Sequence, residues 1–176
     1  MHVFLCGDKQ VGKSTLIRKI LEKAVWTYDG LLSFSRFADG DRHVFLRSVK
    51  GNDEGLLCGI CSNHHITERH PEVFDLAGSS ILTRAGLASD VVVIDEIGSM
   101  ERDAAIYSTC IRDLVSSNSP VVLGVLQDMC QTDLAKWLRS RDNIIWYRVT
   151  EENRDDLVNE ISGRISDELF RQTGSR

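Results

Sequence analysis

The stretch GDKQVGKS, from Gly7 to Ser14, decides the fold of this chain. It matches the pattern of a glycine, four residues and then Gly-Lys-Ser or Gly-Lys-Thr that is typical of a phosphate-binding P-loop. An apolar strand is predicted directly before it, over residues 2–7, and a helix directly after it, over residues 13–25. This strand–loop–helix context makes the short motif specific, and it predicts an α/β nucleotide-binding fold.

Each position of the motif has a physical role. Gly7 and Gly12 permit backbone conformations that a Cβ would disfavour, so that amide N–H groups can point at phosphate oxygens. We expect the Lys13 ammonium to reach the β- and γ-phosphates, the Ser14 hydroxyl to bind Mg²⁺, and Thr15 to meet the α-phosphate. The loop residues expected to bind nucleotide are Gly7, Asp8, Lys9, Gln10, Val11, Gly12, Lys13, Ser14 and Thr15.

A second motif, VVVIDE, begins at Val91 and ends in two acids. The four apolar residues predict a buried strand, and ligands in open α/β sheets bind at the carboxyl ends of strands. We therefore expect Asp95 to hold Mg²⁺ together with Ser14, and Glu96 to orient or deprotonate an attacking water. Lys13 and Glu96 are the predicted catalytic residues.

The rest of the chain alternates strands and helices, which predicts a mainly parallel sheet flanked by helices in a single domain over residues 1–176. A β-hairpin is predicted over 31–49, around Asp39-Gly40. Residues 51–72 are the least regular, with one candidate strand over 56–60. Further helices are predicted over 76–88, 102–116, 132–140 and 151–170, the last with Thr150 as its N-cap, and further strands over 120–126 and 143–149.

Composition excludes several classes of protein. The net charge of −5 does not suggest a nucleic-acid-binding protein, and no apolar run approaches the roughly 18–20 residues that span a membrane. The N-terminus does not resemble a signal peptide, and the five cysteines are an odd number, so we expect reduced thiols in a cytoplasmic protein. The sequence does not indicate an oligomeric state.

Two further patterns carry alternative interpretations. FDLAG, which contains Asp75, has the form of a GTPase switch motif, but the chain has no Asn-Lys-x-Asp guanine signature; we favour a strand-to-helix turn in which Asp75 caps the helix. CGICSNHH places Cys58, Cys61, His64 and His65 close together, with His70 nearby. These residues could bind zinc, or the cysteines could be small buried hydrophobic residues.

The P-loop, DEIGSME (95–101) and VTEENRDDL (149–157) together resemble the small nucleoside-triphosphatase family often called THEP, over nearly the whole chain. The resemblance implies a RecA-like α/β P-loop fold and slow, Mg²⁺-dependent hydrolysis of several nucleoside triphosphates, ATP and GTP among them. Asn153 and Arg154 are either base-contacting residues or, equally, a helix cap and a surface charge.

The chain departs from that family at several positions. Ser99 stands where the family usually has lysine, which leaves open which cation neutralises charge in the transition state; Arg84 and Arg102 are candidates. Gln10 stands where glycine is common, and the hairpin lacks the expected acidic residues.

Two alternatives to a stand-alone hydrolase remain. One is a small-molecule P-loop kinase with an acceptor pocket lined by residues 31–70, and the other is a nucleotide-binding adaptor that a partner activates.

Overall fold

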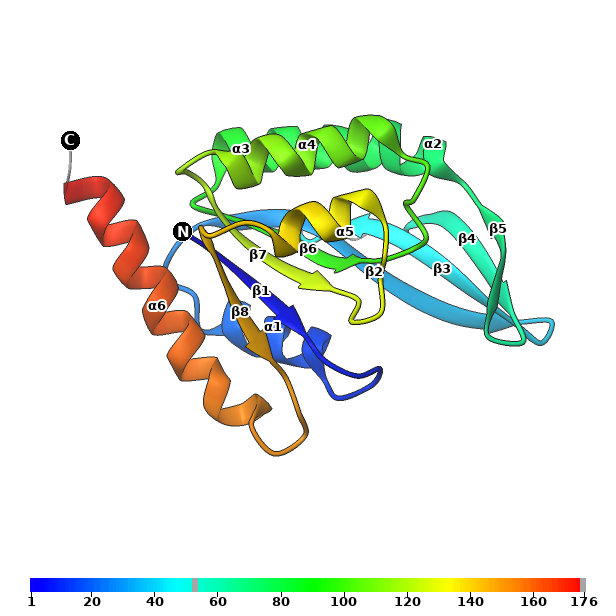
Figure 1. The fold of residues 1–176 in the computed structure, drawn as a ribbon, viewed down its shortest axis with the longest axis horizontal. Coiled ribbons are helices and arrows are strands. Elements are labelled where there is room, and N and C mark those ends of the chain that lie inside the picture. The colour runs from blue at the N-terminus through cyan, green and yellow to red at the C-terminus, as the bar shows by residue number, and fades with distance from the viewer. Residues whose placement is uncertain (52–53, 175–176) are drawn as a thin grey trace.

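The computed structural model describes residues 1–51 and 54–174, which form one eight-stranded sheet with helices on both faces (Figure 1). The strands are β1 (His2–Cys6), β2 (Tyr28–Ala38), β3 (Asp41–Ser48), β4 (Leu56–Ser62), β5 (His65–Arg69), β6 (Val91–Ile97), β7 (Val121–Leu126) and β8 (Ile144–Arg148). The helices are α1 (Lys13–Glu22), α2 (Pro71–Val73), the π-helical turn η1 (Phe74–Gly78), α3 (Ser79–Ala88), α4 (Ala105–Ser116), α5 (Asp133–Arg139) and α6 (Arg154–Gly174).

The sheet has a parallel part and an antiparallel part. Its order is β5-β4-β3-β2-β6-β7-β1-β8. The pairs β2–β6, β6–β7, β7–β1 and β1–β8 are parallel, whereas β2–β3, β3–β4 and β4–β5 are antiparallel. Because the parallel strands run in the same direction, the carboxyl ends of β1, β6 and β7 meet at one edge. Strand β7 separates the P-loop strand β1 from β6.

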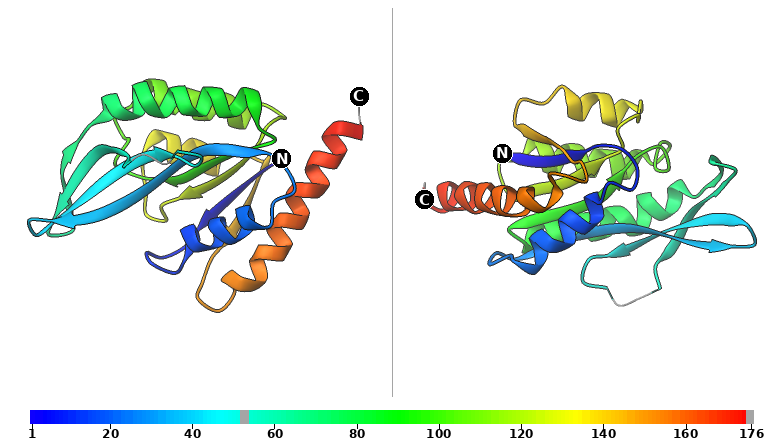
Figure 2. Two further views of the ribbon diagram at one scale, coloured as in Figure 1. Left: turned by 180° about the vertical axis from the view of Figure 1, so that it is seen from behind. Right: turned by 90° about the horizontal axis from the view of Figure 1, so that it is seen from below.

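Two hydrophobic layers hold the helices against the sheet. Helices α3, α4 and α5 pack on one face around Leu82, Ile111 and Leu138, and α1 and α6 pack on the other around Ile17 and Ile161 (Figures 1 and 2). The central strands are therefore covered on both faces, which explains their uninterrupted apolar sequences. Of the helices in the described residues, none is both long and apolar enough to cross a lipid bilayer.

The antiparallel part is larger than the sequence predicted. The hairpin over 31–49 is confirmed as β2 and β3, and its turn residues Asp39 and Gly40 both have positive φ. A second hairpin, β4–β5, occupies most of the stretch described as irregular, of which residues 52 and 53 lie outside the described residues. Its turn, Asn63-His64, has φ values of 48° and 68°. Histidine at a position that usually takes glycine hid the hairpin signal.

The helix predicted to begin at residue 76 begins at Pro71, the position where proline favours a helix start. Asp75 therefore lies inside a helical turn and not at a strand-to-helix junction, which corrects that prediction. Its Oδ1 accepts a hydrogen bond of 2.9 Å from the backbone N–H of Tyr107, in the first turn of α4. Asp75 is thus a helix cap, but for a helix about 30 residues further along the chain.

Helix α6 begins at Arg154, three residues later than predicted, and residues 151–153 form a turn before it. Thr150 Oγ1 accepts a hydrogen bond from Asn153 N at 3.4 Å, while Asn153 Oδ1 accepts one from Thr150 N at 2.8 Å. This reciprocal pair satisfies two backbone donors in the turn that leads into α6, in the manner of a capping box. Thr150 thus stabilises the turn before the helix and does not directly precede the first helical residue.

His2 is the first residue of β1, which lies between β7 and β8, and its side chain is fully buried. Its Nδ1 accepts a hydrogen bond from Val122 N at 3.1 Å, and its Nε2 lies 3.1 Å from Ser117 O. These partners require a neutral ring with the proton on Nε2. Burial lowers the pKa of His2 from 6.5 to about 4, because the charged ring would lose its hydration.

The buried histidine predicts a specific loss of stability in acid. Between pH 6.5 and about 4 the unfolded chain binds a proton at His2 and the folded chain does not, so stability falls as the pH falls. We expect His2→Gln to remove a slope of up to about 1.4 kcal/mol per pH unit from the unfolding free energy in this range. Urea unfolding of both proteins from pH 7 to pH 4.5 measures the difference, and a difference that does not change with pH would refute this role.

Candidate active site

The P-loop wraps around the end of β1 and leads into α1. Gly7 has φ +137°, and a Cβ there would lie 2.5 Å from the carbonyl oxygen of Val149, so that only glycine fits. Gly12 has φ +99°, directly before the helix. Val149 N also donates to Cys6 O at 2.8 Å, which ties the loop to the end of β8. The chain segment between β8 and α6 therefore packs against the start of the P-loop and stabilises it.

Lys13 is almost entirely buried beneath the loop. Its Nζ donates to Gly7 O at 2.9 Å and to Asp8 O at 2.7 Å. An ammonium group has three N–H donors, so one remains for a phosphate oxygen. The two carbonyl oxygens thus fix the position of the Lys13 ammonium group within the P-loop.

The two acids near the carboxyl end of β6 lie in different surroundings. Asp95 is buried, and burial raises its pKa to about 6, against the opposing effect of the hydrogen bond from Ser14. Glu96 is less buried; burial also raises its pKa, while Lys13, Lys9 and Arg42 oppose that shift. The backbone N–H of Glu96 donates to Ser33 Oγ at 3.1 Å, which fixes the acid against β2.

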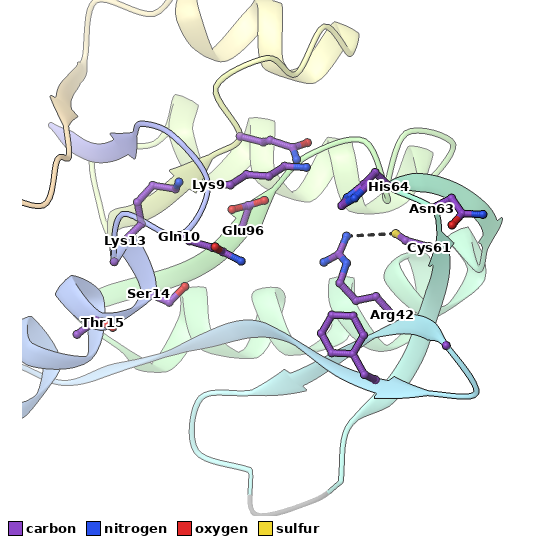
Figure 3. A pocket seen from close by; sticks show the side chains of 14 residues that line it. Lys9, Gln10, Lys13, Ser14, Thr15, Arg42, Cys61, Asn63, His64 and Glu96 are labelled. Carbon is purple, nitrogen blue, oxygen red and sulfur yellow. Dashed lines mark hydrogen bonds between the residues drawn. The ribbon is translucent and has the colours of Figure 1, made fainter.

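Two adjoining cavities open in front of the P-loop. The larger, of about 810 Å³, lies between the loop and the two hairpins, and Figure 3 shows Glu96 between the loop residues and Arg42. The smaller, of about 230 Å³, extends toward Asp95 and the 98–101 turn. Four residues line both cavities: Ser14, Arg42, Glu96 and Gln127. The sequence-predicted residues Lys9, Gln10, Gly12, Lys13, Ser14, Thr15 and Glu96 line the larger cavity.

Two residues of the loop, Asp8 and Gln10, differ from glycine at positions beside the phosphate site. The Asp8 side chain is 79% exposed, and its Oδ1 lies 3.6 Å from Arg148 Nη2 on β8. Gln10 has φ +67°, in the left-handed region where glycine is unstrained. Because glycine adopts positive φ without strain, this conformation would favour glycine over glutamine at position 10.

Asn153 and Arg154 lie behind the loop and do not line either cavity. The Asn153 amide is used within the turn, because its Nδ2 also donates to Arg148 O at 2.9 Å. Arg154 Nη1 donates to Val11 O at 3.4 Å, and its side chain lies against Gly12. Both side chains therefore support the P-loop region from the α6 side.

Arg42 and Gln127 are site residues that the sequence analysis missed. Gln127 directly follows β7, so the rule that ligands bind at the carboxyl ends of parallel strands could have indicated it. Arg42 is the second residue of β3, the second strand of a hairpin, and nothing in its sequence context signals a site. The arginines considered instead lie elsewhere: Arg84 is 60% exposed and 3.8 Å from Asp29, and Arg102 lines a separate cavity.

The 98–101 turn closes the smaller cavity. The Glu101 carboxylate accepts a hydrogen bond from Gly98 N, and burial raises the pKa of Glu101 to about 7. Arg69 Nε donates to Ser99 O at 3.1 Å. The backbone at Ser99 is thus fixed by contacts from within the turn and from β5.

The structure does not bring a zinc ligand set together. Among the residues that it describes, no three His, Cys, Asp or Glu side chains are grouped so that they could hold a metal. Cys58 Sγ donates to Val44 O at 3.3 Å, and burial raises the pKa of its thiol to about 12, whereas a zinc ligand must be a thiolate. Cys61 Sγ accepts a hydrogen bond from Arg42 at 3.2 Å, and His64 is exposed.

The fold and the site define a P-loop nucleoside-triphosphatase. The model of the NTPase family matches residues 2–162, and the chain belongs to that family. It is 27% identical over 165 residues to nucleoside-triphosphatase THEP1 of Thermotoga sp. strain RQ2, covering 92% of this chain and 93% of that protein. It is 30% identical over 178 residues to a cancer-related nucleoside-triphosphatase homolog of Bos taurus, covering 91% and 94%.

The fold agrees with a solved structure of the same kind. The crystal structure of THEP1 from Aquifex aeolicus superimposes with a TM-score of 0.76 at 22% identity, covering 92% of this chain and 96% of that one. The predicted fold class, an α/β P-loop fold with a mainly parallel sheet and a β-hairpin addition, is therefore confirmed.

Proposed function

We propose that this nucleoside-triphosphatase hydrolyses the β–γ phosphoanhydride of Mg²⁺-bound nucleoside triphosphates, with Lys13 and Glu96 as its catalytic residues. The observation that carries the proposal is the position of Glu96, which faces the cavity that Lys13, Ser14 and Thr15 also line. A carboxylate at that position can take a proton from water that attacks a phosphate bound by the loop. The identity and coverage of the relatives support the same class of substrate.

The phosphates would lie along the start of α1. Backbone N–H groups of the loop and the N-terminal end of the helix attract negative charge. The free N–H of Lys13 would bind the β- and γ-phosphates, and Thr15 the α-phosphate. Arg154, which rests against Gly12, would support this part of the loop from the α6 side.

The residues present fit a magnesium ion. The Ser14 hydroxyl is hydrogen-bonded to the buried Asp95 carboxylate, and Mg²⁺ prefers oxygen ligands of this kind. Ser14 and Asp95 would hold the ion, Asp95 through a water or hydroxyl. When bound, the ion neutralises charge on the β- and γ-phosphates.

In the chemical step, the water oxygen bonds to the γ-phosphorus while the bond from phosphorus to the β–γ bridging oxygen breaks. The proton of the water passes to Glu96, and the products are the diphosphate and inorganic phosphate. The raised pKa of Glu96 suits this role, since a general base is most effective when its pKa approaches the working pH. Residues 33–35 of β2 and the 98–101 turn line the smaller cavity, and they would restrict the entry of water from that side.

A small-molecule kinase is the second candidate, and one observation favours it. The far wall of the larger cavity is lined by Phe37, Arg42, Cys61, Asn63 and His64, all from the 31–70 region where an acceptor pocket was expected. An acceptor hydroxyl in that space would replace the attacking water. The partner-activated adaptor would instead need a cation supplied from outside.

The test is phosphate release from ATP, GTP, CTP and UTP by the purified protein, in Mg²⁺ and in EDTA. We expect release from all four nucleotides in Mg²⁺ and none in EDTA. If nucleotide binds but no phosphate appears, the stand-alone hydrolase is refuted. Formation of the diphosphate with transfer of the phosphoryl group to an added acceptor would then indicate the kinase, whereas release of inorganic phosphate only in the presence of a partner protein would indicate the adaptor.

A further inference from the structure

Arg42 occupies a distinctive place in the site. It belongs to β3, on the wall of the larger cavity opposite the P-loop, and it is one of the four residues that line both cavities (Figure 3). Three strong cations line these cavities, and they are Lys9, Lys13 and Arg42. The two lysines belong to the loop, so Arg42 alone of these three approaches from the opposite side.

The guanidinium of Arg42 is held in place but is not neutralised. Its Nη1 donates to Ser35 Oγ at 3.1 Å, and its Nη2 donates to Cys61 Sγ at 3.2 Å. Neither partner carries the charge of a carboxylate. Within residues 1–51 and 54–174, no carboxylate lies within ion-pair distance of Arg42. An oriented guanidinium that has no ion-pair partner and faces the proposed phosphate site is suited to bind an anion.

We propose that Arg42 is a further catalytic residue, an arginine supplied in cis by the hairpin that contacts the γ-phosphoryl group during its transfer to water. This inference rests on the proposed function. As the bond from water forms and the bond to the bridging oxygen breaks, negative charge spreads over the γ-phosphoryl oxygens and the bridging oxygen. Arg42 donates N–H groups to those oxygens, while the water proton still passes to Glu96.

The 98–101 turn, Gly-Ser-Met-Glu, brings no cation to the smaller cavity. Its backbone is fixed by Arg69, whose Nε donates to Ser99 O. Arg42 lines the same smaller cavity as Ser99 and Glu96, but it comes from β3. The cation is thus present in the site although it comes from a different element.

The experiment compares wild type with Arg42→Ala, Arg42→Lys and Arg36→Ala. Arg36 is the matched control, because it lies on the same hairpin but stacks on the other face, 5.3 Å from the Phe34 and Phe45 ring centres. The measurements are kcat and KM for phosphate release, and the affinity for ADP with and without aluminium fluoride, which mimics the transferring phosphoryl group. Thermal unfolding midpoints check that each variant is folded.

We expect Arg42→Ala to lower kcat at least about tenfold with KM within about threefold, and to lose the tightening of ADP binding by aluminium fluoride. Arg42→Lys should recover part of both, and Arg36→Ala should resemble wild type. The proposal is overturned if Arg42→Ala retains kcat, or if it raises only KM. It is also overturned if Lys9→Ala, and not Arg42→Ala, removes the tightening. A wild type without turnover would refute the proposed function itself, a result distinct from these.

Discussion

Replacement of Glu96 by glutamine is expected to lower kcat for phosphate release about 100- to 10,000-fold while ATP still binds. Glutamine has nearly the same size as glutamate, so the cavity keeps its shape, but the amide cannot accept a proton from water. The backbone N–H of residue 96 would still donate to Ser33, because that contact does not involve the side chain. Single-turnover phosphate release and equilibrium ATP binding measure the two effects separately.

Asp95→Asn is the matched comparison for Glu96→Gln, since the two acids are adjacent. Asp95 is placed to hold magnesium, so its variant should require a higher Mg²⁺ concentration, whereas Glu96→Gln should have an unchanged Mg²⁺ requirement. Retention of wild-type kcat in Glu96→Gln would show that another group activates the water. Equal Mg²⁺ requirements in the two variants would show that the roles are not divided as we propose.

Lys13→Ala is expected to weaken ATP binding and to lower kcat by about 100- to 1,000-fold. The ammonium is the deepest positive charge in the loop, and it would be needed both by the bound triphosphate and by the charge that develops on transfer. Wild-type protein should gain thermal stability when ATP and Mg²⁺ are added, because a ligand that binds the folded state stabilises it. The variant should show a much smaller gain.

A structural effect of the same substitution must be separated from the catalytic one. Lys13 also bonds the carbonyl oxygens of Gly7 and Asp8, so its removal could loosen the loop. Lys13→Met keeps most of the side-chain volume and removes the charge, and the unfolding temperature without nucleotide reports on the loop. If both variants bind ATP as wild type does, the assigned role of Lys13 is wrong.

Much of the fold follows from local patterns. The P-loop positions need glycine for reasons that are visible in eight residues, and the buried strands are apolar because both faces of the sheet are covered. The hairpin at Asp39-Gly40 was predictable because its turn has a common signal. The Asn63-His64 turn adopts a similar backbone without glycine, and so the second hairpin was missed.

Interactions between distant segments were not predictable in this way. Asp75 caps α4 because η1 and α4 pack side by side on one face of the sheet, and Asp8 pairs with Arg148 because β8 lies beside β1. The same limit applies to Arg42. Its residue type is common on hairpin surfaces, and only the path of β3 past Ser35 and Cys61 brings its guanidinium to the phosphate site.

The sequence by itself determined the nucleoside-triphosphatase class, and it predicted the residues from Gly7 to Thr15 and the pair Asp95 and Glu96, because each of these depends on a short segment with a specific backbone conformation. The tertiary structure alone decided the sheet order, with β7 between β1 and β6, and the wall that faces the P-loop. Strand pairing and cavity shape arise from packing between segments tens of residues apart, and such contacts leave no periodic or local pattern in the chain.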